Sequence, residues 1–143
     1  MIVQVTETVA RSPAEVFRVV SDVRNDPQWH TDVLDARLTN GVEVAQGSVF
    51  DVTIKPAMGV SGGTITIAEL DPPHRVVMRG RMGKMEPTVT HAVEPVPGGS
   101  RFTRQVELSL PFPMAAMTPL VRRMIAKANK RSVANLKRVL EAG

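Results

Sequence analysis

The sequence predicts an α+β fold in which a curved antiparallel sheet of about seven strands wraps around a long C-terminal helix. From residue 33 to residue 110, short segments of alternating apolar and polar residues follow one another with turns and no helical segment between them. This pattern favours antiparallel neighbours. After residue 113, apolar residues recur at three- and four-residue steps, which is typical of one amphipathic helix.

The N-terminal segment is expected to form one strand and two short helices. Residues 2–10 alternate well enough for a strand. Ser12, Pro13 and Glu15 then give a helix-start signal, with Ser12 as the N-cap of a capping box and Pro13 at the first helical position. Asp22 can cap a second short helical segment over residues 24–30.

The middle of the chain is expected to contain six strands. They are placed at Leu34–Leu38, Val49–Ile54, Thr64–Leu70, Val76–Met82, Thr88–Val93 and Phe102–Leu110. Glycines 59, 62 and 63 are interpreted as a break between two of these strands, and Pro95–Gly99 as a hairpin turn.

The last 30 residues are expected to form the long helix. Thr118-Pro119 marks either its start or a kink. Its expected apolar stripe consists of Met117, Leu120, Val121, Met124, Ala128, Leu136, Val139 and Leu140. A helix with one apolar stripe needs a broad sheet to cover it.

Length and composition favour one globular domain over residues 1–143, expected to be cytoplasmic. The chain contains no cysteine, which excludes disulfides, thiolate nucleophiles and Cys-type metal sites. The N-terminus does not resemble a signal peptide, and no apolar run approaches the ~18 residues that a membrane span needs. No HExxH, Walker or Rossmann pattern is present, so neither a metal nor a cofactor is expected.

The net charge of +4 comes from the C-terminal segment. Residues 114–143 contain seven Lys and Arg residues and one acid, Glu141. Two interpretations stay open: a solvated outer helix face, or contact with an anionic membrane surface or acidic partner. Nucleic acid is not expected, because no aromatic residues are interleaved for base stacking. The oligomeric state is left open.

The opening motif resembles a known superfamily. Residues 12–17 (Ser-Pro-Ala-Glu-Val-Phe), followed by Asp22, Pro27, Trp29 and Val33, are similar to the start of SRPBCC proteins. That superfamily includes START lipid-transfer domains, birch-pollen-allergen proteins and polyketide cyclases/dehydrases. Segments 69–75, 98–101 and 135–141 add weaker similarity. The resemblance implies the helix-grip fold and an internal cavity for a hydrophobic molecule.

Three functions are therefore considered. The first is binding of a lipid-like or polyketide-like small molecule in the cavity. The second is polyketide cyclisation or dehydration, in which His91 or Arg104 would polarise a carbonyl group. The third, implied by ubiquinone-binding and toxin-like relatives, is an interaction through the basic helix.

Strand parity selects the candidate site residues. His91 shares a strand face with Val89 and Val93, and Arg104 shares one with Phe102 and Val106. A charge on that face needs a partner or an anionic ligand group, unless the Arg104 side chain extends to solvent. Trp29 either packs in the core or contacts the ligand. His30 lies either at the mouth of the cavity or, as we expect, in a solvated loop. The cavity is expected to be lined by Trp29, Phe50, Val52, Ile65, Ile67, Met78, Met82, His91, Phe102, Arg104, Met117 and Met124.

Overall fold

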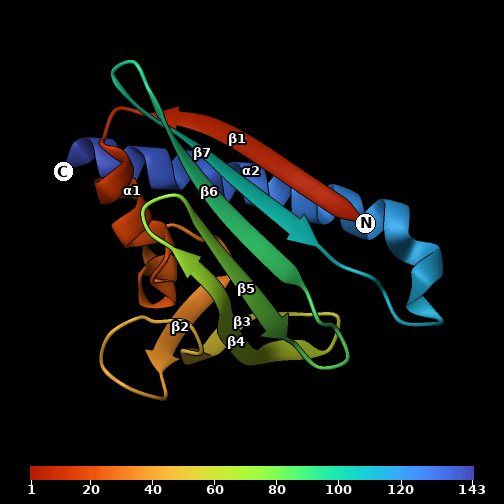
Figure 1. The fold of residues 1–143 in the computed structure, drawn as a ribbon. Coiled ribbons are helices and arrows are strands. Elements are labelled where there is room, and N and C mark those ends of the chain that lie inside the picture. Colours follow the sequence, from red (N-terminus) through yellow and green to blue (C-terminus); the bar gives the residue numbers. More distant parts are fainter.

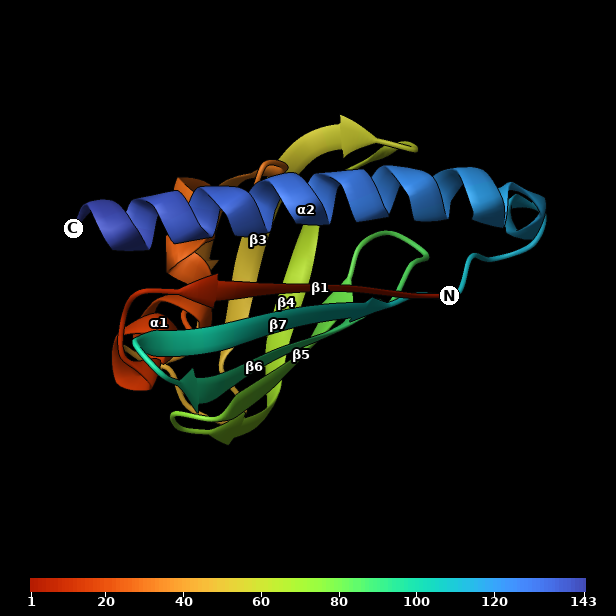
Figure 2. The same ribbon diagram turned by 90° about the horizontal axis from the view of Figure 1, so that it is seen from above.

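The fold is a curled antiparallel sheet that holds a long helix against its concave side (Figures 1 and 2). The computed structural model describes residues 1–143. The elements are β1 (Ile2–Val9), α1 (Pro13–Val20), the 3-10 helix η1 (Val23–Gln28), β2 (Val33–Leu38), β3 (Val49–Ala57), β4 (Val60–Asp71), β5 (Arg75–Arg81), β6 (Thr88–Val96), β7 (Gly99–Glu107), the 3-10 helix η2 (Met114–Met117) and α2 (Thr118–Ala142).

The seven strands form one sheet in the order β1-β7-β6-β5-β4-β3-β2, and every neighbouring pair is antiparallel. Consecutive strands from β2 to β7 are neighbours, and β1 closes the far edge by pairing with β7. Helices α1 and η1 lie near the C-terminal end of α2 (Figure 1). The predicted α+β helix-grip architecture is confirmed.

Two short capping interactions set the start of the helical segment after β1. The Ser12 hydroxyl accepts a hydrogen bond from the Glu15 amide at 3.3 Å, and Pro13 occupies the first turn of α1. The Asp22 carboxylate accepts from the Arg24 amide at 3.0 Å and caps η1. Both caps are as predicted, because a short polar side chain satisfies amides that have no partner within the helix.

The expected break at the glycines of segment 59–63 is wrong in part. Only Gly59, with a φ of 77°, belongs to the turn, and β4 begins at Val60. Gly62 and Gly63 lie inside β4, opposite Thr53 and Val52. A Cβ at either position would overlap a backbone carbonyl oxygen of a neighbouring strand, so these glycines permit close strand approach.

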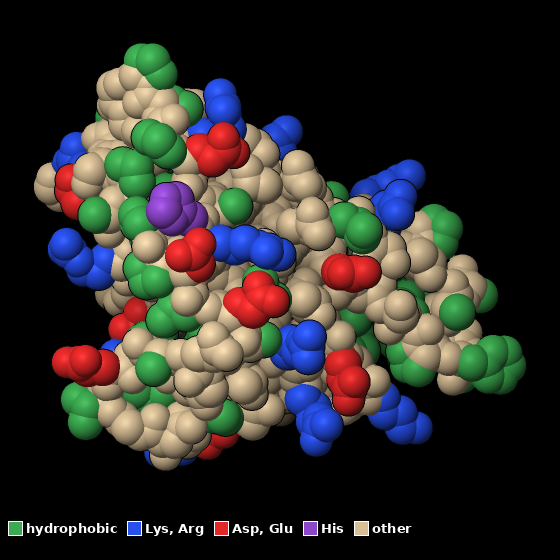
Figure 3. Space-filling model, in the orientation of Figure 1, with side chains coloured by type: hydrophobic (Ala, Val, Ile, Leu, Met, Phe, Trp, Pro, Cys, Tyr) green, Lys and Arg blue, Asp and Glu red, His purple; other side chains and the backbone are tan.

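The buried face of α2 differs from the expected stripe. Its buried residues are Val121, Asn129, Ser132, Val133 and Leu136. Met117, Leu120 and Met124 are instead 46%, 54% and 52% exposed, so their expected packing against the sheet is wrong. The N-terminal part of α2 lies beside a cavity and not on a filled core, and this leaves its flanking apolar side chains uncovered. Figure 3 shows hydrophobic side chains gathered at this end of the molecule.

The structure decides between the two interpretations of Thr118-Pro119, a helix start and a kink. Helix α2 begins at Thr118 and has Pro119 in its first turn, where a missing amide N–H costs no intrahelical hydrogen bond. The 3-10 helix η2 precedes it, and α2 then continues as one helix to Ala142. No helix of the structure combines the length and hydropathy that a membrane crossing requires.

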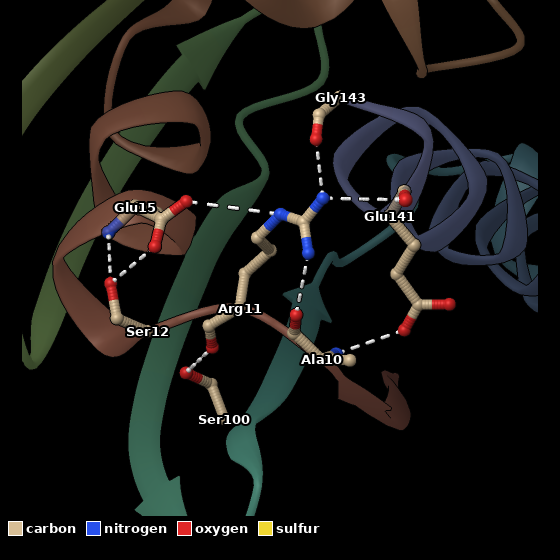
Figure 4. A network of polar contacts seen from close by, with 7 residues as sticks. All are labelled: Ala10, Arg11, Ser12, Glu15, Ser100, Glu141 and Gly143. Carbon is tan, nitrogen blue, oxygen red and sulfur yellow. Dashed lines mark hydrogen bonds and ion pairs between the residues drawn. The ribbon is translucent and has the colours of Figure 1, made fainter.

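A polar network holds the C-terminal end of α2 against the β1–α1 connection (Figure 4). The Arg11 guanidinium donates to the backbone carbonyl oxygens of Ala10, Glu141 and Gly143. The Glu141 carboxylate accepts from the Ala10 amide at 2.9 Å, and this bond is the main cause of its lowered pKa. This end of the helix is therefore fixed to the strand edge.

The core fills the space between the sheet and the α1–η1 segment. Its largest fully buried side chains are Trp29, Phe50, Phe102, Ile67 and Leu136. Trp29 and Phe102 pack edge to face with ring centroids 6.4 Å apart. The concave side of the sheet is thus packed at this end, while the other end holds a cavity.

Candidate functional site

A cavity of about 810 Å³ lies between the sheet and the N-terminal half of α2. Its walls come from strands β3 to β7, from the η1–β2 connection and from residues 121–131 of α2. Hydrophobic residues make up 15 of its 27 lining residues. Small-molecule sites in proteins typically occupy about 300–1,000 Å³ and have mostly apolar walls, so the cavity fits such a ligand.

Six of the twelve residues expected at the cavity line it: Val52, Ile65, Met78, Met82, Arg104 and Met124. Five others are fully packed in the core and do not reach the cavity: Trp29, Phe50, Ile67, His91 and Phe102. Met117 is exposed and also lies outside the lining. Strand parity identified the inward face, but parity does not tell which end of a strand α1 and η1 cover.

The Arg104 side chain enters the structure from β7 and ends in a cluster of polar groups. Its Nη1 lies 2.7 Å from His91 Nε2, its Nη2 lies 3.1 Å from His30 Nε2, and its Nε donates to Asn129 Oδ1 at 3.2 Å. Arg104 is only 6% exposed, so the alternative in which its side chain extends to solvent is wrong. Its guanidinium carbon also lies 5.7 Å from the centre of the Trp29 ring.

His91 is a buried acceptor for Arg104. Its Nδ1 is 2.8 Å from the Val20 carbonyl oxygen, which can only accept, so the ring proton is on Nδ1 and Nε2 accepts from Arg104. Burial, together with the Arg104 charge, holds the pKa of His91 well below its ordinary value. With both ring nitrogens engaged and no access to the cavity, His91 supports Arg104 and does not face a ligand.

His30 lines the cavity, so its expected place in a solvated loop is wrong. Burial and then the Arg104 charge lower the pKa of His30 to about 3. Both histidines are therefore neutral at physiological pH.

Asp26 and Asp32 are the carboxyl groups that line the cavity, and Asp26 is the buried one. Burial raises the pKa of Asp26 to about 7, against the opposing effect of the Arg104 charge. Asp26 and Arg104 line the same cavity, yet no carboxylate lies within 4.0 Å of the guanidinium. A carboxyl with this pKa can exchange a proton near neutral pH.

Sequence reasoning missed Asp26 and Asn129. Asp26 belongs to η1, whose direction relative to the sheet is not encoded in strand parity. Asn129 had a detectable signal, since it continues the inward face of α2 through Val121, Asn129 and Val133. A polar residue on such a buried face needs a partner. The structure contains no group of three or more His, Cys, Asp or Glu residues arranged to hold a metal ion.

Comparisons with known proteins agree with this geometry. A family profile described as polyketide cyclase / dehydrase and lipid transport matches residues 1–141. The chain belongs to this family. No curated protein sequence matches it significantly.

Solved structures show that this family member shares the START-like fold at low sequence identity. A protein from Thermus thermophilus superposes with a TM-score of 0.79 at 15% identity, covering 99% of this chain and 98% of the other. A START superfamily protein from Mycobacterium smegmatis gives 0.77 at 16% identity, with 99% and 97% covered. A protein from Deinococcus radiodurans gives 0.71 at 15% identity, with 100% and 99% covered.

Proposed function

We propose that this family member binds a hydrophobic small molecule in the cavity under α2. The observation that carries the proposal is the 810 Å³ volume with predominantly hydrophobic walls, left open beside a core that is otherwise packed. Such a cavity leaves a large apolar surface in contact with water, and a hydrophobic guest would remove that surface from water. The membership in a family whose description includes lipid transport supports the same function.

The chemistry of the walls suits an apolar guest of variable shape. Met78, Met82 and Met124 line the cavity, and unbranched thioether side chains adapt to their contents. Burial of a guest would be driven at about 25 cal/mol per Å² of apolar surface, less the cost of immobilising it.

Filling the cavity tests this proposal. Met78 is 4% exposed in the centre of β5 and lines the cavity, so Met78→Trp should occupy the space of the guest. The neutral fluorescent probe N-phenyl-1-naphthylamine should bind the wild type, and its fluorescence gain should be lost in this variant. The matched control is Leu34→Trp, which adds the same ring at a 53% exposed position outside the cavity. Equal probe uptake by wild type and Met78→Trp would contradict the proposal.

A second candidate is the cyclase or dehydrase chemistry named in the family description. Asp26, with its pKa of about 7, and the cationic Arg104 line one end of the cavity, where they could transfer a proton and polarise a carbonyl. An intramolecular aldol condensation with loss of water from a poly-β-keto thioester, followed by mass spectrometry, tests this candidate. Turnover should disappear in Asp26→Asn while binding persists; turnover equal to the uncatalysed rate in the wild type would exclude it.

The third function considered from the sequence has weaker support. A protein that acts only through an outer helix face needs no internal cavity, whereas this one has a cavity of about 810 Å³. The basic residues Arg122, Arg123, Lys130 and Arg138 are exposed or half-exposed on α2. Contact of this face with an anionic surface stays a prediction.

A further inference from the structure

The polar end of the cavity contains a buried hydrogen-bond donor that has no acceptor in the protein. Arg104 Nε can only donate, so Asn129 must present its Oδ1 to it at 3.2 Å, and this fixes the direction of the amide group. Asn129 Nδ2 is then buried without any hydrogen-bond partner. Asn129 is 3% exposed and lines the cavity, so its unpartnered amide N–H groups lie just beneath the cavity wall.

His30 cannot serve both of the donors that approach it. The Asp32 amide donates to His30 Nδ1 at 3.1 Å, and Arg104 Nη2 approaches His30 Nε2 at 3.1 Å. A neutral imidazole has one acceptor nitrogen, so it can serve only one of these two donors. One donor at this end of the cavity is therefore left without an acceptor.

The charge of Arg104 has no directly bonded counter-ion, although Asp26 and Asp32 line the same cavity and interact with it at longer range. Its hydrogen-bond partners are two neutral histidines and one amide, and it takes part in none of the ion pairs of the structure. A buried charge is ordinarily paired, because removing it from water without a counter-ion is costly. Lys55, Lys127 and Arg131 also line the cavity, so its lining contains four basic residues and two acidic ones, Asp26 and Asp32.

We propose that the guest is an amphipathic carboxylic acid. Its carboxylate pairs with the Arg104 guanidinium and accepts from Asn129 Nδ2, while its apolar body extends along the wall formed by Met78 and Met82. An anionic oxygen group supplies an acceptor for the buried amide and a directly bonded counter-charge for Arg104 together, whereas an alcohol or an ester supplies no charge. This inference rests on the proposed binding function and specifies its ligand.

A matched pair of ligands separates the inference from the function on which it rests. We would measure the binding of cis-parinaric acid and of its methyl ester at pH 7 by fluorescence, since the two differ only in the charge of the head group. The wild type should bind the acid roughly ten- to a hundredfold more tightly than the ester. Equal binding of acid and ester would overturn the inference and leave the binding function standing; binding of neither would overturn both.

Two substitutions assign the preference to the cluster. Arg104→Met keeps an apolar stem and removes the charge, so acid and ester should bind equally. Asn129→Asp places a carboxylate beside Arg104 Nε, which would satisfy the buried charge from within. This variant should fold with a raised thermal midpoint and show no preference for the acid, even if Arg104→Met fails to fold. A tenfold preference that survives in Asn129→Asp would overturn the assignment.

Discussion

Acidification should destabilise the folded protein through its two buried histidines. The folded-state pKa values of His30 and His91 are lowered, that of His30 to about 3, while the unfolded chain binds protons near pH 6.5. Below pH 6.5 the unfolded chain therefore carries more protons, and the free energy of unfolding falls as the pH falls. Between pH 6.5 and pH 5 His30 removes about 2 kcal/mol, and His91 lowers the stability further in the same direction.

Asp26 changes the free energy of unfolding in the opposite direction over the same pH range. Its folded-state pKa is raised from 3.8 to about 7, so its contribution to stability is complete below pH 3.8 and is lost as the pH rises through 7. From pH 6.5 down to pH 5 the wild type regains about 2 kcal/mol from Asp26. Asp26→Asn should therefore lose about 2 kcal/mol more than the wild type between the two pH values.

Urea unfolding at pH 6.5 and pH 5 measures this difference. Trp29 is the one tryptophan and is 2% exposed, so its fluorescence reports unfolding directly. With a slope of about 2 kcal/mol per M, the midpoint should fall by about 1 M more in Asp26→Asn than in the wild type. His74→Gln serves as the control, because the His74 side chain is 65% exposed. The reasoning is refuted if wild type and Asp26→Asn lose the same stability between the two pH values.

Two further predictions concern the fold. Ser12→Ala removes the cap of α1 and should lower the free energy of unfolding by about 1 kcal/mol, measured by urea unfolding; an unchanged midpoint would show that the cap contributes nothing. Gly99→Ala would place a Cβ against the Val9 carbonyl oxygen at the start of the β7–β1 pairing. Hydrogen exchange at residues 2–9 should then accelerate, and wild-type protection there would contradict the close approach.

The architecture could be predicted because its signals are local. Alternation marks each strand, Ser12 and Asp22 mark helix starts, and the three- and four-residue recurrence of apolar residues marks α2. The errors arose where packing overrides local pattern. Gly62 and Gly63 are turn residues by composition, but here they let two strands approach within the sheet.

The candidate site could be predicted only in part. Parity placed His91 and Arg104 on the inward face, and the structure joins them at 2.7 Å. Strand parity does not indicate which end of a strand is covered by the α1–η1 segment. Phe50 and Phe102 were therefore expected at the cavity, but they are buried in the core with residues of that segment. Asp26 lies 78 residues and Asn129 lies 25 residues away from Arg104 along the chain. Nothing in the local sequence indicates that either residue lies near Arg104 in the fold.

Native mass spectrometry of protein purified from its own host tests most directly whether a hydrophobic small molecule occupies the cavity. We expect a fraction of the protein to carry a non-covalent adduct that is released on unfolding and absent from Met78→Trp, with the properties of an apolar organic acid. A single species at the mass of the bare chain, together with no uptake of N-phenyl-1-naphthylamine by that protein, would contradict the account.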